Sequence, residues 1–224
     1  MLVDPDRSYR RNRVIALGRL SLYGPGASRL HEEILAVAAI WSEGEPIEAF
    51  KTAEAEEKAI ESFSTVLARP ELLEVKDDMV KKVIAGAAKD EEALWETLKK
   101  KAMTRIFWAE DRLRQRARVE ADEMARILEA QRTAIDKELA VRTERDKAAA
   151  AAALQPSLPF APGWLPEEKE QKDQYDADTR HMITRRSRLD AEIASEPQRI
   201  RDLYEVKHHR LERVGLVYLW PATA

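Results

Sequence analysis

Apolar residues recur at intervals of three and four over most of this sequence, which is the spacing of one face of an α-helix. The longest series runs from Asp90 to about Ala153 without a glycine or a proline. We therefore expect one long helix there, with Asp90 as its N-cap. Its predicted buried stripe is Trp95, Leu98, Ala102, Ile106, Ala109, Leu113, Ala117, Ala121, Met124, Leu128, Ile135 and Leu139.

A second helical series returns from about Pro166, after the proline-rich loop 154–165. Its apolar and polar seam positions are Tyr175, Thr179, Met182, Arg186, Leu189, Ile193, Glu196, Ile200 and Leu203. The alternating spacing of four and three predicts that the two series pack as an antiparallel coiled-coil hairpin. Pro197 predicts a break or kink at 195–197, with Ser195 capping a new helix to about Leu211. The pattern leaves open whether the hairpin pairs within one chain or between two chains.

The two ends of the sequence carry shorter patterns. Segments 29–41 and 47–68, and a short stretch after Asp77 or Asp78, have helical spacing, whereas 13–22 alternates with a period of two. The apolar segment "VGLVYLWP" (214–221) also suits a strand, and we expect 215–220 to pair with 15–22. The predicted fold is mainly α. A long hairpin (89–213) stands on a small helical subdomain (1–88), and a two-stranded ribbon joins the subdomain to the segment 214–224.

Composition excludes several classes of function. The chain has no cysteine, so disulfides and thiolate metal sites are absent, and 35% of its 224 residues are charged. No GxxxxGK[ST] loop is present, so we expect no nucleotide hydrolysis, no catalytic residue and no cofactor in this chain. The four histidines are scattered, which argues against a metal site.

Apolar runs are too short to cross a membrane, and the N-terminal residues do not resemble a signal peptide. A cytoplasmic location is the resulting expectation. An arginine-rich start leads directly into the strand-like segment 13–22, so we expect the chain to be a fragment or an excised domain.

Clustered arginines on the two long helical series are candidate nucleic-acid contacts, because fixed cations along a rod suit a phosphate backbone. They are Arg112, Arg114, Arg116, Arg118, Arg185, Arg186 and Arg188. Neighbouring acids, among them Glu110, Asp111, Glu120 and Asp122, are within helical reach and offer salt bridges as the alternative. Both interpretations remain open from the sequence.

The loop 154–165 contains "QPSLPF", in which Gln155, Leu158 and Phe160 have Q-x-x-L-x-F spacing. This spacing resembles the short peptide by which bacterial DNA-handling proteins dock on the sliding clamp. A loop that packs over the tip of the hairpin is the alternative, and extended-peptide docking on another partner is a third.

Two stretches carry a resemblance to a known family: "GRLSLYGPGASRLHEEILAVAAIW" (18–41) and "SEPQRIRDLYEVKHHRLERVGLVYLWP" (195–221). They resemble the C-terminal region of large bacterial Swi/Snf-type helicases, particularly those of the DISARM phage-defence systems. Arg213 stands where the family pattern has proline. The resemblance implies a non-catalytic appendage of an ATP-dependent DNA translocase, whose motor lobes would bind ATP and Mg²⁺.

The implied partners are those motor lobes, DNA and other defence-system proteins, with no membrane. The competing interpretation is a free-standing coiled-coil protein that mediates interaction or oligomerisation without nucleic acid.

Overall fold

The computed structural model describes residues 2–4, 11–69, 77–153 and 166–221. The chain divides into two compact units. One comprises residues 1–113 and 205–224, and we call it the sheet unit. The other, the arm unit, comprises residues 114–204 and is inserted in the sequence between the two segments of the sheet unit.

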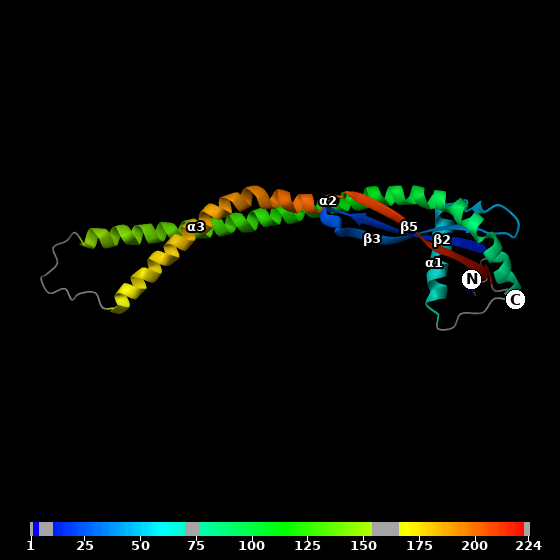
Figure 1. Ribbon diagram of the computed structural model, residues 1–224, viewed down its shortest axis with the longest axis horizontal. Helices are drawn as coiled ribbons and strands as arrows, with labels where there is room; N and C mark the ends of the chain where they lie inside the picture. The colour runs from blue at the N-terminus through cyan, green and yellow to red at the C-terminus, as the bar shows by residue number, and fades with distance from the viewer. Residues whose placement is uncertain (1, 5–10, 70–76, 154–165, 222–224) are drawn as a thin grey trace. The chain divides into compact units, whose positions relative to one another are not determined.

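A five-stranded mixed sheet forms the centre of the sheet unit (Figure 1). Its strands are β1 (Leu2–Asp4), β2 (Arg13–Tyr23), β3 (Arg29–Ile40), β4 (Glu48–Ala49) and β5 (His208–Pro221). Their order across the sheet is β1-β5-β2-β3-β4, with β1 parallel to β5 and the other pairs antiparallel. A 3₁₀ turn, η1 (Pro25–Ala27), connects β2 to β3.

Helices cover both faces of the sheet. Alternate residues of a strand point to opposite faces, so each strand contributes side chains to the packing on both sides. Helix α1 (Ala53–Leu67) packs on one face, where Ala59 contacts the cluster around Ile15 and Ala38. The first part of helix α2 packs on the other face, where Leu98 joins Val14 and the odd-numbered residues of β3. Each strand therefore needs apolar side chains at consecutive positions.

The predicted mainly α fold with a two-stranded ribbon is wrong, since the sheet has five strands. The main error is segment 29–41, which was expected to be helical and forms β3. Its residues 30, 34, 37 and 41 fit a helical stripe, but Leu35, Val37, Ala39 and Trp41 also alternate and are buried together. With Ala36 and Ala38 packed on the opposite face, the run lost the alternation that identifies a strand.

The closing apolar segment does pair with the N-terminal strand, because β5 lies antiparallel to β2 with Val217 opposite Ile15. The predicted match of 215–220 with 15–22 is wrong in extent, since residues 215–219 lie opposite 13–17. The strand is longer than predicted and begins at His208, so residues 208–213 face 18–23. The register shifts between Leu17 and Gly18, where Val214 bulges out of the ladder. Gly215 has φ 157° at this bulge, a backbone conformation that side-chain-bearing residues rarely adopt.

Helix α2 (Asp77–Ala153) is continuous and longer than predicted. The expected helix start at Asp90 is wrong, because this residue lies more than three turns inside the helix and only 8% of it is exposed. The predicted stripe is correct in position: Leu98, Ala102 and Ile106 are buried. In the sheet unit this stripe packs against strands rather than against a second helix.

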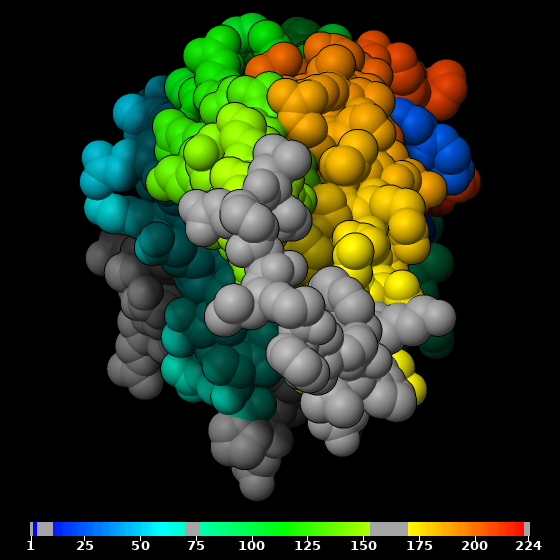
Figure 2. Space-filling model, turned by 90° about the vertical axis from the view of Figure 1, so that its left-hand side faces the viewer, coloured from blue at the N-terminus to red at the C-terminus, as the bar shows by residue number. Residues whose placement is uncertain are grey.

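In the arm unit, residues 114–153 of α2 pack against helix α3 (Pro166–Leu203) within one chain. The two helices lie side by side in the space-filling view, α2 in yellow-green and α3 in yellow to orange (Figure 2). Leu128 and Leu189 are buried between them. Polar links confirm an antiparallel register: Tyr204 Oη donates to Glu120 Oε2 at 2.7 Å, and Arg186 Nε to Asp136 Oδ1 at 2.9 Å.

Of the break or kink expected at residues 195–197, the break is wrong, since α3 runs through Pro197 to Leu203. Proline at this position removes one backbone hydrogen bond, to the carbonyl of Ile193, and the rest of the helix remains. Ser195 does not cap a new helix, because its hydroxyl donates to the carbonyl of Ala191 at 2.8 Å. The helix also ends before the predicted Leu211, which belongs to β5.

Candidate interaction surfaces

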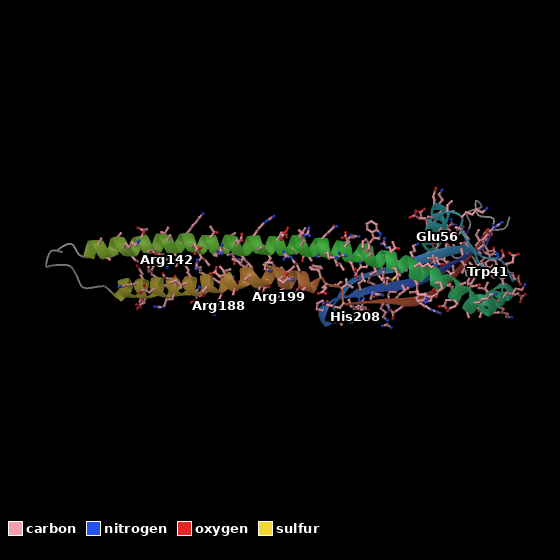
Figure 3. The ribbon with its side chains drawn as sticks, turned by 90° about the horizontal axis from the view of Figure 1, so that it is seen from above. Trp41, Glu56, Arg142, Arg188, Arg199 and His208 are labelled. Carbon is pink, nitrogen blue, oxygen red and sulfur yellow. The ribbon has the colours of Figure 1, made fainter. Side chains whose placement is uncertain are left out.

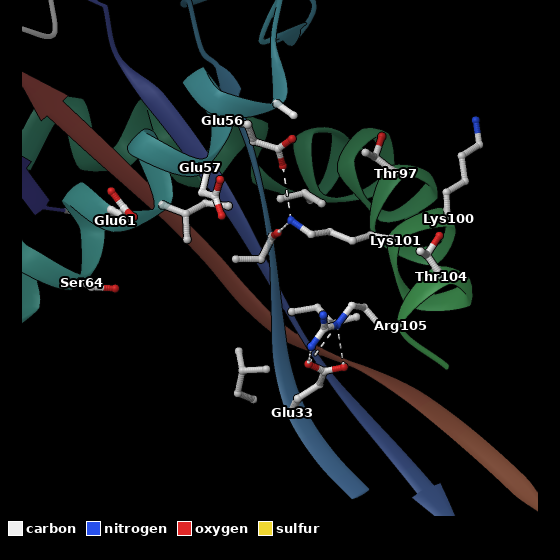
Figure 4. A pocket seen from close by; sticks show the side chains of 16 residues that line it. Glu33, Glu56, Glu57, Glu61, Ser64, Thr97, Lys100, Lys101, Thr104 and Arg105 are labelled. Carbon is white, nitrogen blue, oxygen red and sulfur yellow. Dashed lines mark hydrogen bonds and ion pairs between the residues drawn. The ribbon is translucent and has the colours of Figure 1, made fainter. Parts of the chain in front are cut away.

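Strand β3 has an open edge over most of its length. β4 pairs only with Ala39 and Ile40, so within the described ranges residues 29–38 have no strand partner on that side. A groove of about 820 Å³ follows this edge, with α1 as one wall and α2 as the other (Figure 4). Ile34 lines the groove and is 57% exposed.

Two side chains occupy backbone groups at the open edge. Lys101 Nζ of α2 donates to the carbonyl oxygen of Ala36 at 2.7 Å, and the amide of Ala38 donates to Glu56 Oε1 of α1 at 3.2 Å. The ammonium and the carboxylate lie 3.8 Å apart. Unpaired strand edges invite pairing with other chains, and charged side chains are a common protection.

Further along the groove, Arg105 of α2 forms a bidentate pair with Glu33 of β3, with Nη2 to Oε2 at 2.7 Å. His31 Nε2 lies 3.4 Å from the same carboxylate. Partial burial disfavours the ionised form of Glu33, but the hydrogen bonds from Arg105, together with the nearby His31 imidazole, outweigh it and lower its pKa below the ordinary value. Glu33 therefore stays ionised at neutral pH.

Charge is segregated between the two walls (Figure 4). The α1 wall carries Glu57 and Glu61, which are exposed and have no ion pair in the described part of the chain. The α2 wall carries Lys100, also exposed and without an ion pair there. The groove thus presents acids on one side and a cation on the other, with the strand edge between them.

On the opposite edge of the sheet, β1 pairs only with residues 219–221 of β5. A second groove of about 570 Å³ lies between this edge and α2, lined by Trp95, Met103 and Leu211 among others. Arg213, which precedes Val214 at the bulge, stacks 4.8 Å above the Trp95 ring, and its Nη2 lies 2.9 Å from Glu92 Oε2. An arginine is therefore accommodated next to the bulge.

Asp90 organises a buried polar cluster in the sheet unit. Its Oδ2 accepts hydrogen bonds from Trp41 Nε1 and from Tyr218 Oη, both at 2.8 Å. Burial and the hydrogen bond to Asp90 raise the pKa of Tyr218 far above its ordinary value. Each donor is satisfied by this one carboxylate, so the cluster holds α2 to the ends of β3 and β5. Tyr218 also lines a groove of about 760 Å³ between α2 and β5.

The seven candidate arginines divide into two groups. Arg116 pairs with Glu120 at 2.7 Å, Arg185 with Glu192 at 2.7 Å, and Arg186 with Asp136. The other four are exposed and have no ion pair in the ranges that the structure describes: Arg112, Arg114, Arg118 and Arg188. Figure 3 shows Arg188 on α3. The predicted salt-bridge alternative applies to the first group.

Gln155, Leu158 and Phe160 lie outside the described residues. Among the residues that are described, no three His, Asp or Glu side chains come together in a way that could hold a metal ion. None of the described helices has an apolar stretch that would reach across a bilayer.

Sequence reasoning missed the groove at the β3 edge, because residues 29–41 were assigned to a helix. The alternation of Leu35, Val37, Ala39 and Trp41 was the signal that could have revealed the strand. The sequence also offered no reason to assign Glu57, Glu61 and Lys100 to one site, since only the fold brings α1 and α2 to the same edge of the sheet.

Comparison with known proteins found no matching family model, no similar curated protein and no similar solved structure.

Proposed function

We propose that this chain is a non-catalytic C-terminal module of an ATP-dependent Swi/Snf-type DNA helicase of phage defence. The observation that supports the proposal most is the position of the two stretches that carry the resemblance. Segment 18–41 forms β3 and part of β2, and segment 195–221 contains β5. Although the arm separates them in sequence, Gly18–Tyr23 pairs with Arg213–His208 in one sheet.

The two units suggest a division of roles. The sheet unit would contact the motor lobes or other defence-system proteins, and the arm unit would contact DNA or a partner protein. ATP and Mg²⁺ would be bound by the motor lobes, and this chain would work in the cytoplasm without a cofactor of its own.

DNA contact would come from cations that are not engaged in ion pairs. In the arm unit the candidates are Arg114, Arg118 and Arg188, since Arg116, Arg185 and Arg186 already face carboxylates. Arg114 and Arg118 are four residues apart and therefore lie on one side of α2. Acids and bases are nearly equal in number along the arm, so binding would be weak and local.

The test measures the affinity of the chain for duplex and single-stranded DNA as the salt concentration changes. Changing Arg114, Arg118 and Arg188 to glutamine should weaken binding, and the slope of log K against log salt should fall by about 0.9 for each lost duplex contact. The matched control changes Arg69, Lys81 and Lys89, three exposed cations of the sheet unit, to glutamine. This control should leave both quantities unchanged.

Absence of DNA binding at low salt would remove the DNA-contact version. The wider proposal would fail if the reading frame upstream of Met1 did not encode a GxxxxGK[ST] motor. Oligomerisation through the helical seam is the competing function, and it is disfavoured by the burial of Leu189 against α2 of the same chain.

A further inference from the structure

We propose that the groove along the open edge of β3 binds an extended peptide whose side chains alternate between basic and acidic. The peptide would add to the sheet as a strand beside residues 33–37, between α1 and α2. This inference goes beyond the proposed helicase function and does not depend on it.

The backbone of β3 supplies the first argument. The carbonyl of Ala36 and the amide of Ala38 both point out of the sheet, since each meets a side chain at the open edge. Lys101 provides a donor where an added strand would place an N–H, and Glu56 provides an acceptor where it would place a C=O. A ligand strand would exchange both contacts for backbone hydrogen bonds, as in other strand-addition complexes.

The charges of the two walls supply the second argument. Successive side chains of an added strand point to opposite faces of the sheet. Those on one face would meet Glu57 and Glu61 of α1, and those on the other would meet Lys100 of α2. Charge complementarity therefore selects basic residues on the first face and acidic residues on the second.

Ile34 adds a sequence-independent contact. It is 57% exposed on the strand edge, where the aliphatic stems of lysine or glutamate side chains can cover it. Ser64, Thr97 and Thr104 line the same groove and offer hydroxyl groups to a polar ligand.

A second copy of this chain fits the groove less well. Antiparallel pairing of two β3 edges about a twofold axis normal to the sheet would keep both α1 helices on the same face. Glu57 and Glu61 would then face the α1 wall of the partner, and like charges in close contact are unfavourable.

The experiment uses two fluorescein-labelled peptides of identical composition, KEKEKEKE and KKKKEEEE, and measures their binding to the full chain by fluorescence anisotropy at low salt. Only the first peptide can place all its lysines on one face of a strand and all its glutamates on the other. We expect it to bind at least about tenfold more tightly. Equal affinities would overturn the proposal.

Charge-reversal variants locate the site. E57K/E61K should reduce binding of the alternating peptide about tenfold or more, because two attractive contacts become repulsive. E123K/E129K makes the same change in net charge at exposed positions of the arm unit and should have no effect. Equal losses in the two variants would show a nonspecific charge effect and refute the site.

The K101M variant separates strand addition from simple electrostatic binding. It removes the side chain that occupies the carbonyl of Ala36, so the alternating peptide should bind more tightly than it binds the unmodified chain. Unchanged or weaker binding would contradict strand addition. Sedimentation of the chain alone tests the other occupant. If the chain forms a dimer that E57K/E61K disrupts or strengthens, and if it binds no peptide, the groove holds a second copy and the proposal is overturned.

Discussion

Gly18 of β2 lies directly against Leu98 of α2, and a Cβ atom at Gly18 would overlap Cδ2 of the leucine. Leu98 is fully buried, so it has little space into which it can move. This contact fixes how closely helix α2 approaches the sheet.

Replacing Gly18 with alanine should therefore destabilise the sheet unit, by about 1–3 kcal/mol, as is typical of overpacking. Urea unfolding followed by circular dichroism measures the change. Adding L98A to G18A should cost less than the sum of the two single changes, because the smaller side chain makes room for the new methyl group. G86A is the control: the nearest atom to its new Cβ is Asp90 Oδ2 at 3.8 Å, so it should stabilise α2 by up to about 1 kcal/mol.

Changing Asp90 to serine distinguishes the predicted N-cap role of this residue from its observed role as a buried hydrogen-bond acceptor. Serine is as good an N-cap as aspartate, so a capping role predicts almost no loss of stability. The observed contacts with Trp41 and Tyr218 predict a loss of about 1–3 kcal/mol for each buried donor left without an acceptor. Tryptophan fluorescence during urea unfolding reports the result, and D77S, at the observed start of α2, is the matched control.

Because of Tyr218, the free energy of unfolding of the sheet unit should depend on pH in the alkaline range. Its pKa is raised in the folded chain by burial first and by Asp90 second. The folded state therefore holds this proton more tightly than the unfolded state does. The stabilisation by Tyr218 should be fully present below about pH 10, the ordinary tyrosine pKa, and should be lost as pH rises beyond it. The free-energy difference between the unmodified chain and Y218F should accordingly shrink above pH 10, and a constant difference would contradict the assignment.

Pro197 weakens a helix that continues through it. P197A should restore the amide hydrogen bond to the carbonyl of Ile193 and should stabilise the arm by up to about 3 kcal/mol. The mean residue ellipticity at 222 nm and Tm should both rise. A chain with a true break at 195–197 would show no such gain, since the proline would then occupy a favourable first-turn position.

Leu189 is the test of pairing within the arm. It is fully buried, whereas Ile183, on the same helix, is 54% exposed. L189D should unfold the arm and lower helicity, with a cost above about 3 kcal/mol, because a charge replaces a buried side chain. I183D should change stability by no more than about 0.5 kcal/mol. Equal effects of the two changes would show that the seam is not where the structure places it.

Periodicity identified the long helices because their solvent faces are charged. Leu98 and Leu189 stand in series interrupted by lysine, arginine and glutamate, so the spacing of three and four is unambiguous. The same method failed at β3, where helices cover both faces of the sheet and the apolar residues are consecutive. Sequence reasoning failed at Asp90 as well. An aspartate ahead of an amphipathic series looks the same in the sequence whether its carboxylate accepts a hydrogen bond from a backbone amide or from two distant side chains.

The pairing of β5 with β2 was predictable for a different reason. "VGLVYLWP" and the segment around Ile15 were the two strand-like segments recognised in the sequence, and each needed a partner. The extent of the strand was not predictable, since residues 208–213 are polar apart from the partly buried Leu211 and show no alternation of apolar and polar residues. The groove is formed by that sheet and two helices, so no pattern within one segment of the sequence predicts it.

The pairing of β5 with β2 has a consequence for the order of events during synthesis. Arg19 and Glu212 form an ion pair although they are 193 residues apart. Until β5 leaves the ribosome, β2 can pair only with β3, and its other side has no neighbour in the sheet. The arm helices make local contacts and can form earlier. The nascent chain thus exposes an apolar strand edge for most of its translation, and this is the period in which it would need a chaperone.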